Sequence, residues 1–164
     1  MIEIQLNLPG RVYQSDMPWS VQYDETGALI EEYRRRRVDV VVVLSPDEEI
    51  RQNTGRDLVA IYRAEGWEVI HLSVPNLGVP ARDDLCNAVN LALMHAQAGR
   101  CIVVHCHAGI GRTGMFLAVL SGMALGMGSE SAIAYVRRFV EGAVETEEQF
   151  AMVGELLDGR STAL

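Results

Sequence analysis

The sequence predicts an α/β fold in which a central, mostly parallel sheet of four to five strands is flanked by helices. Two short valine-rich runs, at residues 38–44 and 101–105, are typical of strands that are buried on both faces. Helical patterns alternate with strand patterns up to about residue 105, and only helical patterns follow. Ligands of such sheets bind where the carboxyl end of a strand turns into a helix, so we expect the functional site there.

The alternation emerges when the elements are taken in chain order. We expect a strand at 11–14, a helix at 27–37, a strand at 38–44, a helix at 55–64, a strand at 67–72, a helix at 83–98, a strand at 101–105, and helices around 112–125, 129–140 and 146–157. Ser45 and Pro46 close the second of these strands, and Gly66 marks a helix end before the third. The helix at 83–98 has apolar residues at a spacing of three and four, which predicts one buried face.

The composition describes one acidic domain. The 164 residues include 14 Lys and Arg against 22 Asp and Glu, a formal charge of −8, and 49% of them are hydrophobic. Because no repeat or low-complexity tract divides the chain, we expect a single domain over residues 1–158 and a loose tail at 159–164. An acidic chain lacks the excess of Lys and Arg with which proteins neutralise nucleic acid or anionic lipid, so neither partner is expected.

Two further features favour a cytoplasmic protein with reduced thiols. No apolar stretch approaches the ~20 residues that span a bilayer, and the first ten residues lack the basic and then apolar pattern of a signal peptide. Three cysteines cannot all pair with one another, and a domain of this length needs no disulfide to hold its core. We expect Cys86 and Cys101 to be core residues, which leaves Cys106 as the candidate for chemistry.

The segment HCHAGIGRTG, from His105 to Gly114, follows the strand at 101–105 directly and opens an apolar helix. A glycine-bearing turn between a strand and a helix presents successive backbone N–H groups to an anion, and the helix N-terminus adds roughly half a positive charge. Gly109 and Gly111 permit the left-handed or crowded backbone that such a turn needs. We therefore predict a phosphate cradle formed by His107, Ala108, Gly109, Ile110, Gly111 and Arg112.

Cys106 lies at the floor of this cradle, where the field that binds phosphate also favours the thiolate over the thiol. This makes Cys106 a candidate nucleophile. Arg112 can fold back and offer two parallel N–H donors to a phosphoryl group, and its charge suits a metaphosphate-like transition state. We expect Thr113 to donate its hydroxyl to the cysteine sulfur, and the imidazole or backbone of His105 to support the loop.

This segment resembles the signature H-C-x5-R, followed by Ser or Thr, of the cysteine-dependent protein tyrosine phosphatases, especially their small dual-specificity branch. Weaker resemblance extends through residues 74–80 and 144–149. The resemblance implies that Cys106 attacks phosphorus to form a phosphocysteine, that Arg112 clamps the phosphoryl group, and that Gln149 positions the water that releases phosphate. It implies no cofactor and no metal, and a substrate that is a phosphorylated protein or a small phosphomonoester.

The chain departs from this family in the loop that normally carries the general acid. Asn76 stands where the family has an aspartate, and an amide cannot give a proton to a departing oxygen. General acid catalysis is typically worth roughly 10² to 10⁴ in rate. Three explanations stay open: Asp83 or Asp84 donates the proton, the chain is a substrate-trapping form, or the natural leaving group needs little protonation. Both aspartates equally suit the first turn of the helix that follows, where the dipole favours negative charge.

Other interpretations of these residues also stay open. The glycine-bearing turn could hold a buried, unreactive cysteine, or His105, Cys106 and His107 could ligate a metal, although neighbours on a strand end point to opposite faces. Thr146 and Gln149 also form a capping box at a helix start. The leading hypothesis is a tyrosine or dual-specificity phosphatase, and the rival is a phosphate-binding pseudophosphatase that keeps the cysteine and arginine but lacks the acid. A rhodanese-like sulfurtransferase or an arsenate reductase shares only a cysteine in an anion-binding loop.

Overall fold

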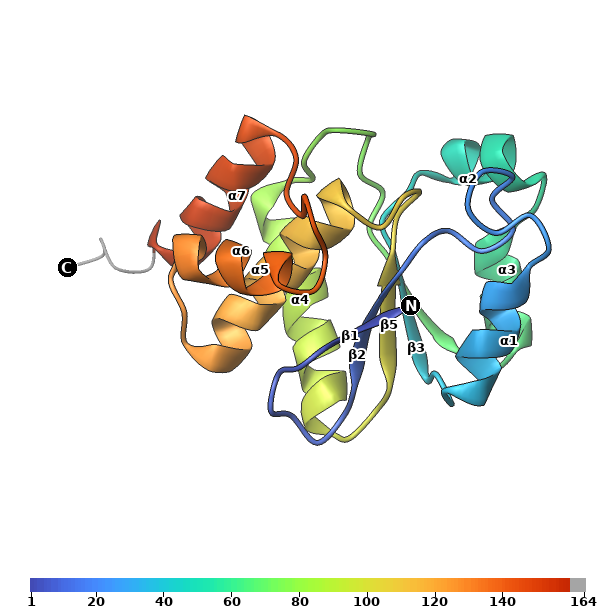
Figure 1. Ribbon diagram of the computed structural model, residues 1–164, viewed down its shortest axis with the longest axis horizontal. Helices are drawn as coiled ribbons and strands as arrows, with labels where there is room; N and C mark the ends of the chain where they lie inside the picture. The colour runs from blue at the N-terminus through green and yellow to red at the C-terminus, as the bar shows by residue number, and fades with distance from the viewer. Residues whose placement is uncertain (160–164) are drawn as a thin grey trace.

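The computed structural model describes residues 1–159, which form a five-stranded sheet with helices on both faces (Figure 1). The strands are β1 (Ile2–Ile4), β2 (Val12–Ser15), β3 (Val40–Val43), β4 (Glu68–His71) and β5 (Ile102–His105). The helices are α1 (Ala28–Arg35), α2 (Asp47–Thr54), α3 (Leu58–Ala64), α4 (Arg82–Gln97), α5 (Gly111–Leu125), α6 (Ser129–Arg137) and α7 (Glu147–Leu157). The predicted α/β class is confirmed.

The sheet has the strand order β1-β2-β5-β3-β4, and all of its pairs are parallel except β1 with β2. His105 at the end of β5 is level with Ser15 on one neighbour and Val43 on the other. The carboxyl ends of the central strands therefore meet at one edge, with β5 in the middle. The antiparallel strand β1 was not predicted, because it has only three residues and two of them are exposed.

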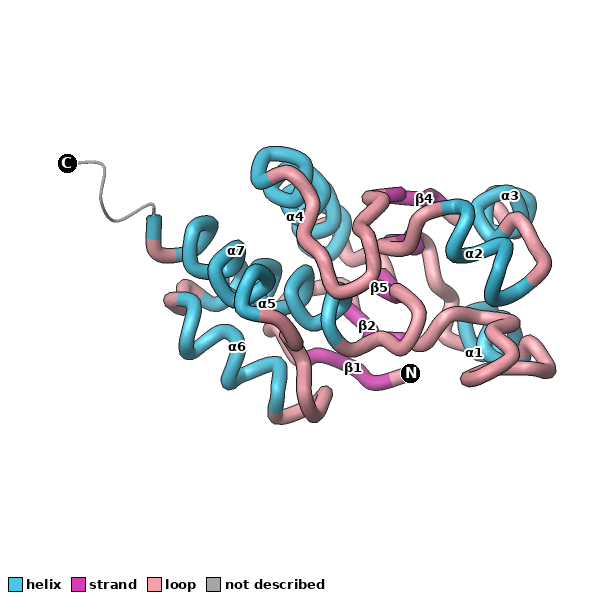
Figure 2. Tube along the Cα trace, turned by 90° about the horizontal axis from the view of Figure 1, so that it is seen from above, coloured by secondary structure: helices cyan, strands magenta, loops and turns pink. Residues whose placement is uncertain are grey.

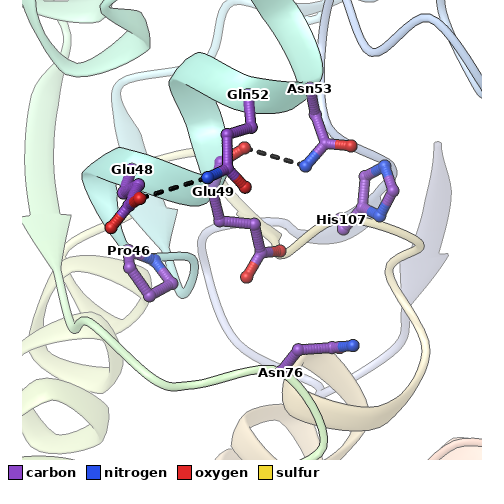
Figure 3. A pocket seen from close by; sticks show the side chains of 7 residues that line it. All are labelled: Pro46, Glu48, Glu49, Gln52, Asn53, Asn76 and His107. Atoms are coloured by element: carbon purple, nitrogen blue, oxygen red, sulfur yellow. Dashed lines mark hydrogen bonds between the residues drawn. The ribbon is translucent and has the colours of Figure 1, made fainter.

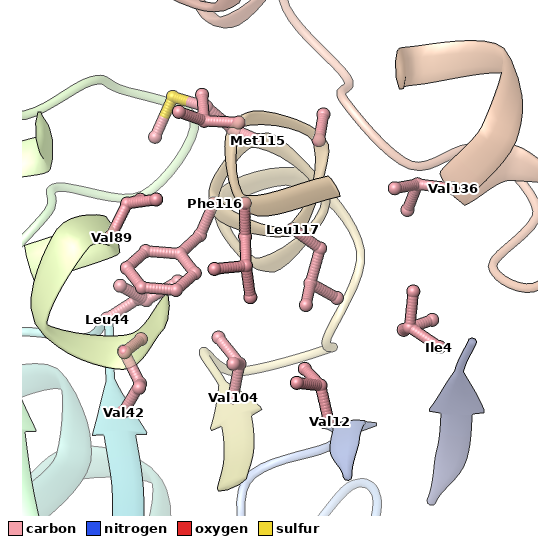
Figure 4. Close-up of a cluster of buried hydrophobic side chains, with 14 of the residues drawn as sticks. Ile4, Val12, Val42, Leu44, Val89, Val104, Met115, Phe116, Leu117 and Val136 are labelled. Carbon is pink, nitrogen blue, oxygen red and sulfur yellow. The ribbon is translucent and has the colours of Figure 1, made fainter. Parts of the chain in front are cut away.

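Two hydrophobic cores cover the two faces of the sheet, with α4 to α7 on one side and α1 to α3 on the other (Figure 2). Alternate residues of β3 serve the two cores: Val40 and Val42 belong to the first, and Val41 and Val43 to the second. This explains why the strand is valine throughout. Phe116 of α5 lies over the sheet in the first core (Figure 4).

The helix α2 was missed because its sequence carries no apolar stripe. Ile50 is its only buried residue, and the three acidic residues of its first turn suit the helix dipole rather than a core. The helix expected at 55–64 begins only at Leu58. Gly55 has a left-handed backbone that ends α2, and Asp57 caps α3 by accepting a hydrogen bond from the Ala60 N–H at 2.9 Å.

Two of the expectations concern the C-terminal tail and the membrane. We predicted a loose tail at 159–164, but residues 160–164 lie outside the described residues. Within residues 1–159 no single helix is long and apolar enough to cross a bilayer. The pair α5 and α6 meets the length and composition criteria only when taken together, and it is bent by 115°.

Candidate active site

The predicted cradle lies between the end of β5 and the start of α5. Gly109 has a φ of 68°, in the left-handed region that favours glycine. A Cβ atom there would lie 2.1 Å from Nε2 of Gln14 and 2.6 Å from the carbonyl oxygen of Ser15. The Gln14 amide donates a hydrogen bond to the Gly109 carbonyl at 3.2 Å. The end of β2 thus packs directly against the loop, and glycine is needed for both its conformation and its lack of a side chain.

His105 is fully buried, and both of its ring nitrogens are hydrogen-bonded. Nδ1 lies 3.0 Å from the Cys106 carbonyl, which can only accept, so Nδ1 carries the proton and Nε2 accepts from the Tyr62 hydroxyl at 2.9 Å. Burial lowers the pKa of His105 to about 4, so the ring is neutral at physiological pH. His105 therefore ties the first turn of the loop to α3.

His107 fixes the other side of the loop. Its Nε2 lies 3.1 Å from the Ser20 hydroxyl, its carbonyl accepts from the Met17 N–H at 3.0 Å, and Tyr23 packs edge-on against its ring. The segment that follows β2 therefore borders the cradle. The sequence patterns gave no signal for this segment, because its contact with the loop depends on the pairing of β2 with β5.

Arg112 is 3% exposed, and its guanidinium is held by residues far away in the sequence. Nη1 and Nη2 donate to the two carboxylate oxygens of Glu49 at 2.8 and 2.7 Å. Nη1 also donates to the Val74 carbonyl at 3.0 Å, and Nη2 donates to Oδ1 of Asn76 at 3.3 Å. The edge of the guanidinium that Nη1 and Nη2 form is thus occupied by the Glu49 carboxylate. The two parallel donors predicted for phosphate are the ones that bind Glu49.

Glu49 was missed together with α2, the helix that carries it. Glu49 lies in the first turn of α2, six residues after the end of β3, the neighbour of β5. Its side chain points into a hollow of about 510 Å³ beside the cradle (Figure 3). Burial alone would raise the pKa of Glu49, but hydrogen bonds and charge from Arg112 outweigh burial and hold the pKa below its ordinary value of 4.5. Glu49 is therefore a carboxylate at neutral pH. A carboxylate just after a buried central strand was the one available sequence signal.

Cys106 is 2% exposed and lines a cavity of about 210 Å³. Asn76, His107, Arg112 and Glu145 also line this cavity. Burial of the guanidinium lowers the pKa of Arg112, but the hydrogen bond and charge of Glu49, together with Cys106, outweigh burial and hold the pKa above its usual value. Cys106 and Arg112 line the same cavity, which therefore brings a thiol and a cation together with the hydrogen-bonding side chains of Asn76, His107 and Glu145.

Asp83 is not brought to this cavity. Because α4 begins at Arg82, Asp83 and Asp84 lie in its exposed first turn. The side chain of Asp83 is 88% exposed, and its partner is the neighbouring Arg82 at 3.3 Å. Both aspartates lie where the helix dipole favours negative charge, and neither lines the cavity that contains Cys106.

The hydroxyl of Thr113 is not bonded to the cysteine sulfur, so that prediction is wrong. Thr113 is completely buried, and its Oγ1 has no hydrogen-bond partner among the described residues. Helix α5 already begins at Gly111, so Thr113 is carried into the interior with the helix. Within residues 1–159 no group of three or more His, Cys, Asp or Glu side chains gathers in a way that could hold a metal ion.

Gln149 is completely buried and connects two segments that border the cavity. Its Oε1 accepts from the Glu145 N–H at 2.9 Å, and its Nε2 donates to the Gly78 carbonyl at 3.3 Å. The Thr146 hydroxyl caps α7 by accepting from the Gln149 N–H at 3.2 Å. The Thr146 half of the predicted capping box is therefore present. The other half differs, because the Gln149 side chain accepts from the N–H of Glu145 and not from that of the cap residue Thr146.

Comparison with known proteins decides the family. The sequence model of the family described as "Polymorphic toxin system, DSP-PTPase phosphatase" matches residues 19–123, which is more than half of the chain. The chain belongs to this DSP-PTPase family. The matched range includes Glu49, Asn76 and the whole cradle from Cys106 to Arg112.

Solved phosphatase structures have the same fold over at least 95% of this chain. The crystal structure of Tk-PTP in its active form is 26% identical, with a TM-score of 0.77 over 95% of this chain and 96% of that one. The kinase associated phosphatase is 20% identical and has the same fold, with a TM-score of 0.87 over 100% of this chain and 97% of that one. An uncharacterized protein of Methanocaldococcus jannaschii is 39% identical over 92 residues, which cover 56% of this chain and 60% of the relative. The chain thus matches less than two thirds of that relative.

Proposed function

We propose that this DSP-PTPase family member is a phosphomonoester hydrolase that forms a phosphocysteine on Cys106. The observation that carries the proposal is the convergence of three features on one cavity: the Cys106 thiol, the N-terminus of α5 and the Arg112 guanidinium. Each of them favours an anion, and the thiol among them is a nucleophile. Family membership supports the same reaction class.

In the proposed reaction, the Cys106 sulfur attacks phosphorus while the bond to the leaving oxygen breaks. Backbone N–H groups of residues 107–112 and the Arg112 guanidinium bind the three non-bridging oxygens. Because Glu49 occupies the edge of the guanidinium formed by Nη1 and Nη2, a phosphoryl group takes the other edge, formed by Nε–H and Nη2–H, where it replaces the Asn76 amide oxygen as the acceptor. Glu49 then orients Arg112 as a fixed donor. Water attacks the phosphocysteine and releases phosphate, and Gln149 is proposed to order that step.

A rapid-mixing experiment with p-nitrophenyl phosphate tests this function. A hydrolase of this kind releases a burst of about one p-nitrophenol per active site when formation of the phosphocysteine outpaces its hydrolysis, and acid quench traps phosphate on the protein. Cys106→Ser removes both the burst and the trapped phosphate. Turnover that survives in Cys106→Ser, or native protein that never becomes phosphorylated, contradicts the proposal.

One observation favours a second candidate, a phosphate-binding protein with little turnover. Asn76 occupies the position of the expected acid and accepts a hydrogen bond from Arg112 instead of presenting a proton to the cavity. The same experiment separates the two functions, because a binding protein takes up phosphate or vanadate without forming a phosphocysteine. For the hydrolase, we propose a phosphorylated protein or a small phosphomonoester as the substrate, and the cytoplasm as the location.

A further inference from the structure

We infer that Glu145 is the general acid of this site and takes over the role that Asn76 cannot fill. The inference rests on the proposed hydrolase function and adds to it a catalytic residue. Within residues 1–159, Glu145 provides the only carboxyl group that lines the cavity containing Cys106. A residue that protonates the leaving oxygen must stand at this cavity, because that oxygen departs on the side of phosphorus opposite the sulfur.

The close approach of Glu145 to the cradle is built into the loop. A Cβ atom at Gly111 would lie 2.1 Å from Oε2 of Glu145, so the carboxylate occupies the space that any side chain at Gly111 would need. Gly111 is not among the residues with positive φ, whereas Gly109 is. The lack of a side chain at Gly111 therefore serves this contact rather than a special backbone conformation, and it places the carboxylate against the N-terminus of α5.

The backbone of Glu145 is held in place from two sides. Its N–H donates to Oε1 of the buried Gln149 at 2.9 Å. Just before it, Arg137 donates to the carbonyls of Ala143 and Val144 at 2.8 and 3.0 Å. Val144 has a φ of 65°, which is rare for a β-branched residue and persists only when its surroundings enforce it. The segment is thus fixed where the Glu145 side chain meets the cavity.

The other titratable groups of the cavity suit the role less well. The Nε2 atom of His107 is engaged by the Ser20 hydroxyl, and Tyr23 packs edge-on against the His107 ring. Cys106 is the nucleophile, and Arg112 stays charged. These four groups, Glu49 behind Arg112, and Arg137, whose guanidinium binds the carbonyls just before Glu145, are the charged and titratable groups around Glu145 that a pH profile reports.

The proton balance of the proposed reaction is simple. In the first step the sulfur–phosphorus bond forms, the bond from phosphorus to the leaving oxygen breaks, and the Glu145 carboxylic acid gives its proton to that oxygen. In the second step a water oxygen bonds to phosphorus, the sulfur–phosphorus bond breaks, and the Glu145 carboxylate takes a proton from the water. The cycle returns Glu145 to its protonated form and releases phosphate and the dephosphorylated alcohol or phenol.

The variant Glu145→Gln tests the inference, because it keeps the size of the side chain and removes the proton. With phenyl phosphate, a poor leaving group, we expect kcat/KM to fall about 10²-fold or more and the basic limb of its pH profile to flatten. With p-nitrophenyl phosphate, whose leaving group needs little protonation, we expect less than about a tenfold loss and a retained burst of p-nitrophenol.

Two further variants serve as controls. Glu145→Asp keeps a carboxyl group and should restore the basic limb at a reduced rate. The exposed Glu148, three residues on, does not line the cavity, so Glu148→Gln is the matched control and should match the native protein.

The outcomes separate this inference from the proposed function. If native protein forms the phosphocysteine and Glu145→Gln keeps both the basic limb and the native ratio of rates for the two substrates, Glu145 is not the acid and the hydrolase proposal stands. If native protein forms no phosphocysteine, both proposals fall. Loss of rate without any change in the basic limb assigns Glu145 a structural role and overturns the inference.

Discussion

Cys101 and Cys106 stand immediately before and after the same strand, β5, and are 9% and 2% exposed, yet their surroundings are opposite. At Cys101, burial and the charge of Asp39 raise the pKa of the thiol to about 11. The Asp39 carboxylate accepts a hydrogen bond from the Cys101 N–H at 2.8 Å. At Cys106, the neighbours are the backbone of the loop, the N-terminus of α5 and the Arg112 guanidinium. Two thiols of similar burial therefore lie in opposite electrostatic surroundings.

The polarity of the chain explains the difference. In a parallel sheet each strand is preceded by the C-terminus of a helix and followed by the N-terminus of another, so negative and positive ends of helix dipoles gather at opposite edges. Helix α4 ends at Gln97, shortly before Cys101, and α5 begins at Gly111, shortly after Cys106. The two thiols thus lie at edges of opposite electrostatic character.

The largest difference between the two edges of the sheet is expected when each cysteine is replaced by serine. Cys106→Ser removes the nucleophile, and we expect kcat/KM for p-nitrophenyl phosphate to fall by at least about 10³-fold. Cys101→Ser should stay within about twofold of native protein, because its thiol only fills space at the far edge. Steady-state rates measure both, with thermal unfolding as the check on folding. Similar losses in the two variants would show that reactivity does not follow the polarity of the sheet.

The second largest effect is expected for Arg112→Lys. An ammonium keeps the charge but cannot bind Glu49 through two parallel donors and serve a phosphoryl group at the same time, so we expect kcat/KM to fall about 10²-fold. Arg100, which binds Glu68 at the opposite edge, offers the control. Arg100→Lys should change kcat/KM by less than about twofold. An equally active Arg112→Lys would mean that charge alone, and not the fixed geometry, stabilises the transition state.

Glu49→Gln tests the charge at the Cys106 edge of the sheet through the stability of the protein at acidic pH. The pKa of Glu49 is held below 4.5, so its contribution to stability is complete above about pH 4.5 and is lost as the pH falls through the lowered value. At pH 7 the variant should be less stable by about 2 kcal/mol, because the buried charge of Arg112 loses its partner. Urea unfolding at pH 7, 5, 4 and 3 should show this gap closing below about pH 4.5. A gap that stays constant down to pH 3 would contradict the depressed pKa.

The smallest effect is expected for Asp39→Asn, which keeps a hydrogen-bond acceptor for the Cys101 N–H and removes its charge. We expect the pKa of Cys101 to fall below about 11 but to stay above its ordinary value of 9.0, because burial is the larger cause of the shift. Alkylation of Cys101 by iodoacetamide, followed by mass spectrometry across pH, measures the change. Labelling at neutral pH as fast as that of Cys106 would show that Asp39, and not burial, keeps the thiol inert.

The fold class, the central strands and the glycine-bearing loop that follows β5 could be predicted from the sequence. These features are local, because strand and helix periodicity and the strand–glycine–helix turn are carried by consecutive residues such as Cys106, Gly109 and Gly111. Only elements without a clear pattern escaped, namely β1 with its three residues and α2 with its single buried Ile50.

The side chains that reach this loop from distant parts of the sequence are known only from the three-dimensional arrangement of the elements. Glu49 binds Arg112 across 63 positions of sequence, Tyr62 binds His105 across 43, and Glu145 enters the cavity from the segment before α7. Asp83, by contrast, lies in an exposed helix turn, and Thr113 lies in the interior. The physical reason is that strand order and helix packing set these distances, and neither leaves a signal in the spacing of residues along the chain.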